Sequence, residues 1–128
     1  MSMSERESLD ALAEIVIGAA YEVANTLGAG FLEKVYERAL VAELRIRGVI
    51  AESQAPFIVR YKGEEVGTYF ADVLVDRHLI VEVKCAEAFA NEHLAQALNY
   101  LKATDLRLAL LINFQSPKVE WRRVVYKF

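Results

Sequence analysis

Apolar residues recur every three or four positions in the first third of the chain, which is the spacing of an amphipathic helix. The first such pattern predicts a helix from about residue 8 to residue 27, with Ser4 or Ser8 available to cap its start. Gly28-Ala29-Gly30 then interrupts the pattern, as a helix end followed by a turn would. A second stripe predicts another helix from about residue 32 to residue 47.

After residue 54 the spacing changes to the alternation that is typical of strands. The run at 106–113 is almost entirely apolar, as a central strand covered on both faces would be. The order of elements predicts a mixed β-sheet flanked by helices, an α/β fold that forms a single domain over residues 1–128. The predicted strands cover 57–61, 66–75, 79–84, 106–113 and 119–126, and a third helix covers 92–102 with Asn91 as its cap.

Composition narrows the class of protein. Hydrophobic residues make up 55% of the 128 residues, which excludes a disordered chain and favours some self-association. No apolar run reaches the roughly 18–20 residues that span a bilayer. The start of the chain is polar and lacks a signal-peptide pattern, and Cys85 is the only cysteine, so no internal disulfide can form. These features predict a cytoplasmic protein.

The formal net charge of −3 gives no support to nucleic-acid binding, because nucleic-acid binders usually present a basic face. It does not exclude such binding, since a metal site concentrates acidic residues beside a separate basic surface. Arg45, Arg47, Arg122 and Arg123 are the candidate basic positions. The competing interpretation is that they are ordinary solvated charges.

The strand at 79–84 carries the candidate chemistry. Glu82 and Lys84 are two residues apart and therefore point to the same face, within a strand that is otherwise apolar. If Asp76, Arg77 and His78 form a three-residue loop, the hairpin register places Asp72 directly opposite Glu82. Opposed residues have Cβ atoms about 4.5–5.5 Å apart, so the two carboxylates repel each other unless a cation lies between them.

A hard divalent cation, Mg²⁺ or Mn²⁺, suits such a pair of carboxylates. Asp72, Glu82 and the main-chain carbonyl of Val83 are the predicted metal ligands, with waters completing the coordination. Lys84 is then placed to orient a water or to stabilise the charge that grows on a phosphate in the transition state. The alternative interpretation is a salt bridge between Lys84 and one of the two acids on a solvated sheet face.

The pattern Asp72…Glu82-Val83-Lys84 resembles that of the PD-(D/E)XK nuclease superfamily, although Ala71 stands where the name places a proline. The predicted helices before and after the three strands are similar to the core order of that superfamily. The resemblance implies a restriction-endonuclease-like core. It also implies a metal-dependent nuclease that hydrolyses the phosphodiester bonds of DNA, in preference to RNA.

A closer resemblance lies in Gly30-Phe31-Leu32-Glu33-Lys34-Val35-Tyr36, which is similar to the signature of the GxxExxY protein family of this superfamily. The similarity extends from the segment 17–23 to the segment 111–114. Superfamily members often carry a helix glutamate that approaches the metal, and the resemblance implies this catalytic role for Glu33. The alternative is an acid in a first helical turn that only complements the helix dipole.

The third helix carries Gln96-x-x-x-Tyr100, which resembles an element of the RecB-like branch of the superfamily. The spacing of four puts both side chains on one face, and His93 lies on the same stripe. The resemblance implies that these three residues contact a substrate phosphate or base. The alternative is a polar helix margin. Cys85 is interpreted as a small residue packed beside the site, not as a nucleophile.

Three functions compete at this stage. The first is a Mg²⁺- or Mn²⁺-dependent nuclease with nucleic acid, above all DNA, as its partner. The second is a nucleic-acid- or protein-binding module that keeps the fold without turnover, and the third is a metal-binding subunit of a larger assembly. A homodimer formed through residues 119–128 is also expected, because Trp and Arg are enriched at interface centres. The alternative for Trp121 is packing against the first helix of its own chain.

Overall fold

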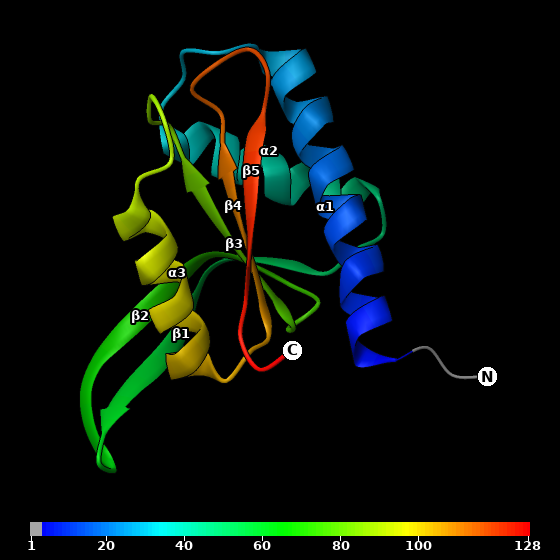
Figure 1. The fold of residues 1–128 in the computed structure, drawn as a ribbon. Coiled ribbons are helices and arrows are strands. Elements are labelled where there is room, and N and C mark those ends of the chain that lie inside the picture. The colour runs from blue at the N-terminus through cyan, green and yellow to red at the C-terminus, as the bar shows by residue number, and fades with distance from the viewer. Residues whose placement is uncertain (1–3) are drawn as a thin grey trace.

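The computed structural model describes residues 4–128. Eight elements follow one another in the order that the sequence predicts (Figure 1). The helix α1 begins one residue after Ser4, whose hydroxyl accepts the Glu7 N–H and so confirms one of the two predicted caps. The elements are α1 (Glu5–Leu27), α2 (Glu33–Ile46), β1 (Ala51–Tyr61), β2 (Glu64–Val75), β3 (Leu79–Lys84), α3 (Asn91–Thr104), β4 (Leu108–Asn113) and β5 (Glu120–Val125).

The strands form a five-stranded mixed sheet in the order β1-β2-β3-β4-β5. Only β3 and β4 run parallel, because α3 carries the chain back between them; the other neighbours are antiparallel. Every residue of β4 is buried, which confirms the central strand that its apolar run predicts. The helices α1 and α2 cover one face of the sheet and α3 covers the other (Figure 1).

The start of β1 differs from the sequence prediction by six residues, because the strand begins at Ala51 and not at residue 57. Ala51 packs under α1 and α2, whereas Ala55 packs under α3. Residues four apart on a regular strand would share a face. The reversal occurs at Gln54, whose φ of +53° is rare for a residue other than glycine. A pattern search that assumes strict alternation cannot recognise this strand.

The partner strand β2 changes face at the same place. Val73 and Val75 pack under α1 and α2, whereas Tyr69 and Ala71 pack on the α3 side. Beyond this point β1 and β2 continue only with each other, and their hairpin projects past the end of the sheet (Figure 1). The twist therefore turns the two strands from members of the sheet into an arm beside α3.

The start of α3 corrects another expectation. Its N-cap is Ala90 and not Asn91. The ring of His93, three residues along, accepts the Ala90 N–H at Nδ1 with a distance of 3.1 Å. A histidine in the first turn therefore satisfies the main-chain N–H of the N-cap residue, although the cap itself has no side chain that can accept a hydrogen bond.

Tyr36 fixes the connection between α1 and α2. Its side chain is 1% exposed and its ring stacks on Phe114, just beyond β4, with centroids 4.7 Å apart. The phenol donates to the Gly28 carbonyl at 2.6 Å and accepts the Phe31 N–H at 3.2 Å. One side chain thus joins the end of α1, the start of α2 and the end of the central strand.

The strand β5 lies at an edge of the sheet, as predicted. Trp121 is 37% exposed and lines a groove of about 460 Å³ together with residues of α1. It therefore faces the first helix of its own chain and still presents part of its surface. Among residues 4–128, no helix is both long and apolar enough to cross a membrane.

The four candidate arginines do not form a free basic face. All four are exposed and each contacts another residue of the chain, which favours the competing interpretation of ordinary solvated charges. Arg45 donates to the Ala51 carbonyl, Arg47 pairs with Glu43, Arg122 lies over the Phe89 ring, and Arg123 pairs with Asp10.

We predict that Tyr36→Phe lowers the free energy of unfolding by about 1–3 kcal/mol, because it removes two partly buried hydrogen bonds that each contribute about 0.5–1.5 kcal/mol. Urea denaturation measures the change. Tyr61→Phe is the matched control, since Tyr61 is 62% exposed in the hairpin, and it is expected to behave as the parent protein. Equal stability of the two variants would contradict the role given to the Tyr36 hydroxyl.

Candidate active site

The β2–β3 hairpin has the register that the sequence predicts. Residues 76–78 form a three-residue turn, in which Asp76 and Arg77 both have positive φ. Val75 then pairs with Leu79, and Val73 pairs with Val81. The same register brings Asp72 and Glu82 opposite each other at the next position.

The ladder between the two strands ends at Val73, and the carboxylates bridge the gap where the strands part. The main-chain N–H of Asp72 lies 3.4 Å from Glu82 Oε2. In return, the N–H of Val83 donates to Asp72 Oδ2 at 2.9 Å. Two acidic side chains therefore occupy a fork in the sheet, each in contact with the backbone of the opposite strand.

Glu82 is the more deeply placed acid, with 5% of its surface exposed. Tyr69, on the arm, donates its hydroxyl to Glu82 Oε1. Burial and, after it, the negative charge of Asp72 together raise the pKa of Glu82 to about 8. Burial and the charge of Glu82 also raise the pKa of the Tyr69 hydroxyl, which therefore stays a donor. Among residues 4–128, no lysine, arginine or histidine forms an ion pair with either acid.

Lys84 opens on the same groove as the two acids. The groove has a volume of about 580 Å³, and Asp72, Glu82, Lys84, Tyr69 and Tyr100 are among its lining residues. Among the described residues, Lys84 takes part in no ion pair. The salt bridge that was the alternative interpretation is therefore absent, and the ammonium group is free for another partner.

Comparison with known proteins agrees with this geometry. The family model of the PD-(D/E)XK nuclease superfamily matches residues 10–124. The chain belongs to the PD-(D/E)XK nuclease superfamily. Its mixed sheet flanked by helices is the restriction-endonuclease-like fold of that superfamily. Searches of curated proteins and of solved structures found no match.

The acidic donors of this superfamily member fit a small divalent cation. Within residues 4–128 no three His, Cys, Asp or Glu side chains are grouped so as to enclose a metal. Two facing carboxylates remain, and Mg²⁺ is usually held by one or two carboxylates, with waters and substrate phosphates supplying the other oxygens. A cation between Asp72 and Glu82 would also remove the repulsion that raises the pKa of Glu82.

Glu33 and Cys85 lie near Lys84 and are not grouped with Asp72 and Glu82. Glu33 accepts the N–H of Cys85, next to Lys84, at 3.0 Å, but it does not form a three-acid group with Asp72 and Glu82. Cys85 itself is half-buried and packs against the core below α1 and α2.

On α3, Tyr100 reaches the groove and stacks on Tyr69 with ring centroids 3.8 Å apart. Gln96 is exposed, one helical turn earlier. His93 uses Nδ1 to accept the Ala90 N–H, which favours the polar-margin interpretation for that residue. Of the three predicted substrate contacts, only Tyr100 lines the groove.

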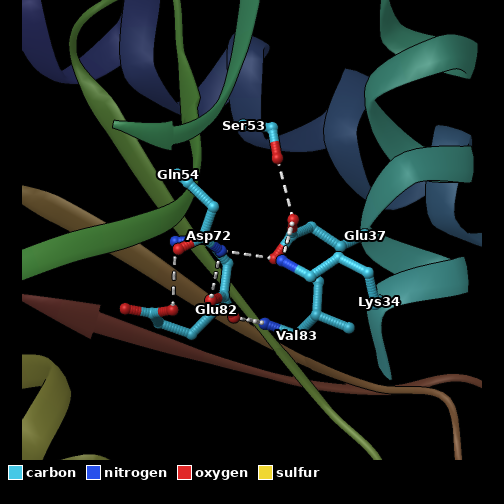
Figure 2. A network of polar contacts seen from close by, with 7 residues as sticks. All are labelled: Lys34, Glu37, Ser53, Gln54, Asp72, Glu82 and Val83. Atoms are coloured by element: carbon cyan, nitrogen blue, oxygen red, sulfur yellow. Dashed lines mark hydrogen bonds and ion pairs between the residues drawn. The ribbon is translucent and has the colours of Figure 1, made fainter. Parts of the chain in front are cut away.

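Three residues of the site escape sequence reasoning, namely Glu37, Gln54 and Tyr69. Glu37 is 3% exposed on α2, and Gln54 connects it to Asp72 (Figure 2). Tyr69 and Asp72 are three residues apart, so strict alternation would put them on opposite faces. The Tyr69 hydroxyl reaches Glu82 only because β1 and β2 exchange their faces at Gln54 and the residue opposite it. No pattern in the sequence predicts this exchange of faces.

We predict that the stability of the metal-free protein falls as the pH rises from about 4.5 to about 8. In this window the folded protein holds a proton on Glu82 that the unfolded chain has released, so the folded state loses its advantage as the pH increases. One such proton contributes a slope of at most about 1.4 kcal/mol per pH unit. Chemical denaturation across the pH range measures the slope.

The control for this prediction is Glu82→Gln, whose carbonyl can still accept the Tyr69 hydroxyl and which carries no titrating group. Its stability relative to the parent protein is expected to increase with pH over the same window. Parallel curves for the two proteins would show that Glu82 does not hold the extra proton.

Proposed function

We propose that this superfamily member is a divalent-metal-dependent nuclease that hydrolyses the phosphodiester bonds of nucleic acid, DNA in preference to RNA. One observation carries the proposal. Asp72 and Glu82 face each other with no basic side chain of the described residues paired to either, and Lys84, which forms no ion pair there, opens on the same groove. The main-chain bonds of the two acids would serve a binding module equally well, but the lysine beside them supports phosphodiester hydrolysis.

The proposed cofactor is Mg²⁺ or Mn²⁺, held by Asp72, Glu82 and the main-chain carbonyl of Val83. When bound, the cation would supply Lewis-acid chemistry, which neutralises phosphate charge and makes a water easier to deprotonate. Tyr69 donates to one oxygen of Glu82 and leaves the other near Asp72. The Val83 N–H holds one oxygen of Asp72 in the same way.

Lys84 is proposed to bind the scissile phosphate and to stabilise the charge that develops on it. Its ammonium group has no carboxylate partner among the described residues to give up, so it can meet a phosphate without first breaking an ion pair. Charge stabilisation by a fixed donor in a partly dry site contributes more than in water.

Substrate contacts are proposed for Tyr100 and Gln96, which share one face of α3, and for the free Nε2 of His93. The stack of Tyr100 on Tyr69 leaves an aromatic surface beside the acids, and aromatic rings bind the bases of single strands. The catalytic role predicted for Glu33 stays a prediction. Its bond to the Cys85 N–H, next to Lys84, supports an influence on the site.

Membership of the GxxExxY family is proposed from the similarity of residues 30–36 to the signature of that family. The structure supports a role for the residues of this signature. Gly30 has a φ of +111°, which favours glycine, and Tyr36 binds both sides of the turn. Glu33 joins that turn to the end of β3. Each signature residue therefore has a distinct task in placing α2 against the candidate site.

We predict that Mg²⁺ and Mn²⁺ raise the melting temperature and permit cleavage of DNA. A cation at 100 times its dissociation constant adds about 2.7 kcal/mol to the free energy of unfolding when it binds only the folded protein. Asp72→Asn should lose both the thermal shift and cleavage. Lys84→Ala should keep the thermal shift and lose about 100- to 1000-fold in rate, because it removes charge stabilisation but no metal ligand.

The assay offers single- and double-stranded DNA and RNA to each protein in parallel. Metal binding and nucleic-acid binding without cleavage of any substrate would favour the non-catalytic module. Cleavage by Asp72→Asn at the rate of the parent protein would contradict the proposed site, because the activity would then not depend on Asp72.

A homodimer through β5 is also proposed. The strand is an edge with unpaired main-chain groups, and Trp121 and Val125 keep 37% and 41% of their surface exposed. Light scattering at micromolar concentration is expected to give twice the mass of the chain, and Val125→Lys should return it to the monomer mass. A monomeric parent protein at every concentration would exclude this dimer.

A further inference from the structure

Gln54 has a backbone conformation that a strand residue does not normally adopt. Its φ is +53° in the middle of β1. The residues on both sides keep the same register with β2, Ser53 with Val73 and Ala55 with Ala71, but Gln54 itself is skipped. The left-handed region is strained for a residue other than glycine, and such conformations persist where the surroundings impose them, often at functional sites.

The side chain of Gln54 lies between two acids (Figure 2). Its amide nitrogen donates to Glu37 Oε1 at 2.8 Å and lies 3.4 Å from Asp72 Oδ1. The first bond has ordinary length and anchors the amide, whereas the second is long. The anchored amide therefore faces Asp72 from one side and limits the orientations of that carboxylate.

The anchor is itself firmly held. Glu37 is 3% exposed and accepts hydrogen bonds from Lys34 Nζ at 3.0 Å and from Ser53 Oγ at 2.8 Å, besides the bond from Gln54. The contact with Lys34 is also an ion pair within α2, so the carboxylate that anchors Gln54 is partly neutralised. The chain of contacts thus runs from helix α2 through a fixed acid and a neutral amide to Asp72.

Asp72 is held from its other side by the strand β3. Its Oδ2 accepts the Val83 N–H at 2.9 Å, and its Oδ1 faces Gln54. Both donors are uncharged, so they fix the direction of the carboxylate without neutralising it. A lysine or arginine in place of Gln54 would pair with Asp72 and compete with any cation.

We propose that Gln54 is a positioning residue, which adopts its strained conformation in order to orient Asp72 toward Glu82 for cation binding. The part of this inference that concerns the cation rests on the proposed function. The orientation of Asp72 does not, because it can be measured in the metal-free protein. Partners that support a metal ligand in this way typically contribute 10- to 100-fold to metal affinity.

The test uses Gln54→Gly and Gln54→Asn in the full chain. Glycine accepts the positive φ without strain and removes the amide, whereas asparagine tolerates the backbone but is one methylene too short to reach both acids. Calorimetric titration with Mn²⁺ is expected to show an affinity at least about 10-fold lower for both variants.

Two controls separate orientation from general effects on the fold. Lys62→Gly relieves another left-handed residue, with a φ of +49° in the hairpin turn, and should leave Mn²⁺ affinity unchanged. Ser53→Ala removes a bond to Glu37 but none to Asp72, and should change the affinity less than twofold. A loss in Ser53→Ala as large as that in Gln54→Gly would overturn the proposal.

A second readout needs no metal. The amide proton of Val83 reports its bond to Asp72 Oδ2 by its NMR chemical shift, and Asp72→Ala supplies the value without that bond. Gln54→Gly should move the Val83 shift toward that value, whereas Lys62→Gly should not. If the parent protein binds no Mn²⁺ but the Val83 shift moves, the proposed nuclease function fails and the positioning role stands. An unchanged Val83 shift in Gln54→Gly overturns the positioning role.

Discussion

The parting of β2 from β3 after Val73 is the constraint on which the candidate site depends. While the strands pair, their main-chain groups satisfy each other and their side chains pack into the two cores. Once β2 twists away, the N–H of Val83 needs another acceptor, and the Asp72 carboxylate supplies it. The fork therefore needs polar side chains for structural reasons, and their placement in a groove is what the proposed function depends on.

The electrostatics of the fork are held in an unfavourable state by the fold around it. Glu82 is buried beside a second acid, and both effects raise its pKa to about 8. Tyr69, Gln54 and Val83 contribute only neutral donors, which orient the acids and leave their mutual repulsion in place. A divalent cation, as proposed, would relieve that repulsion, and the relief would contribute to its binding.

Much of the fold and the central acid pair follow from the sequence. Helical and alternating spacing locate the elements in order, and the apolar run at 106–113 identifies the central strand. A three-residue turn fixes a hairpin register without reference to the rest of the chain, because side chains alternate along a strand with a period of two. Local geometry alone therefore brings Asp72 to Glu82 and puts Lys84 on the same face as Glu82.

The sequence by itself determined the elements, the hairpin register and the acid–acid–lysine set, since each depends on residues close together in the chain. Only the tertiary structure decided what surrounds that set. The faces of β1 are reversed at Gln54, and a glutamine in a strand does not indicate a positive φ. The reversal brings Tyr69 to Glu82 and lets Gln54 connect Glu37 to Asp72. Contacts of this kind depend on how distant elements pack, and packing distances are not encoded in the spacing of residues along a strand or helix.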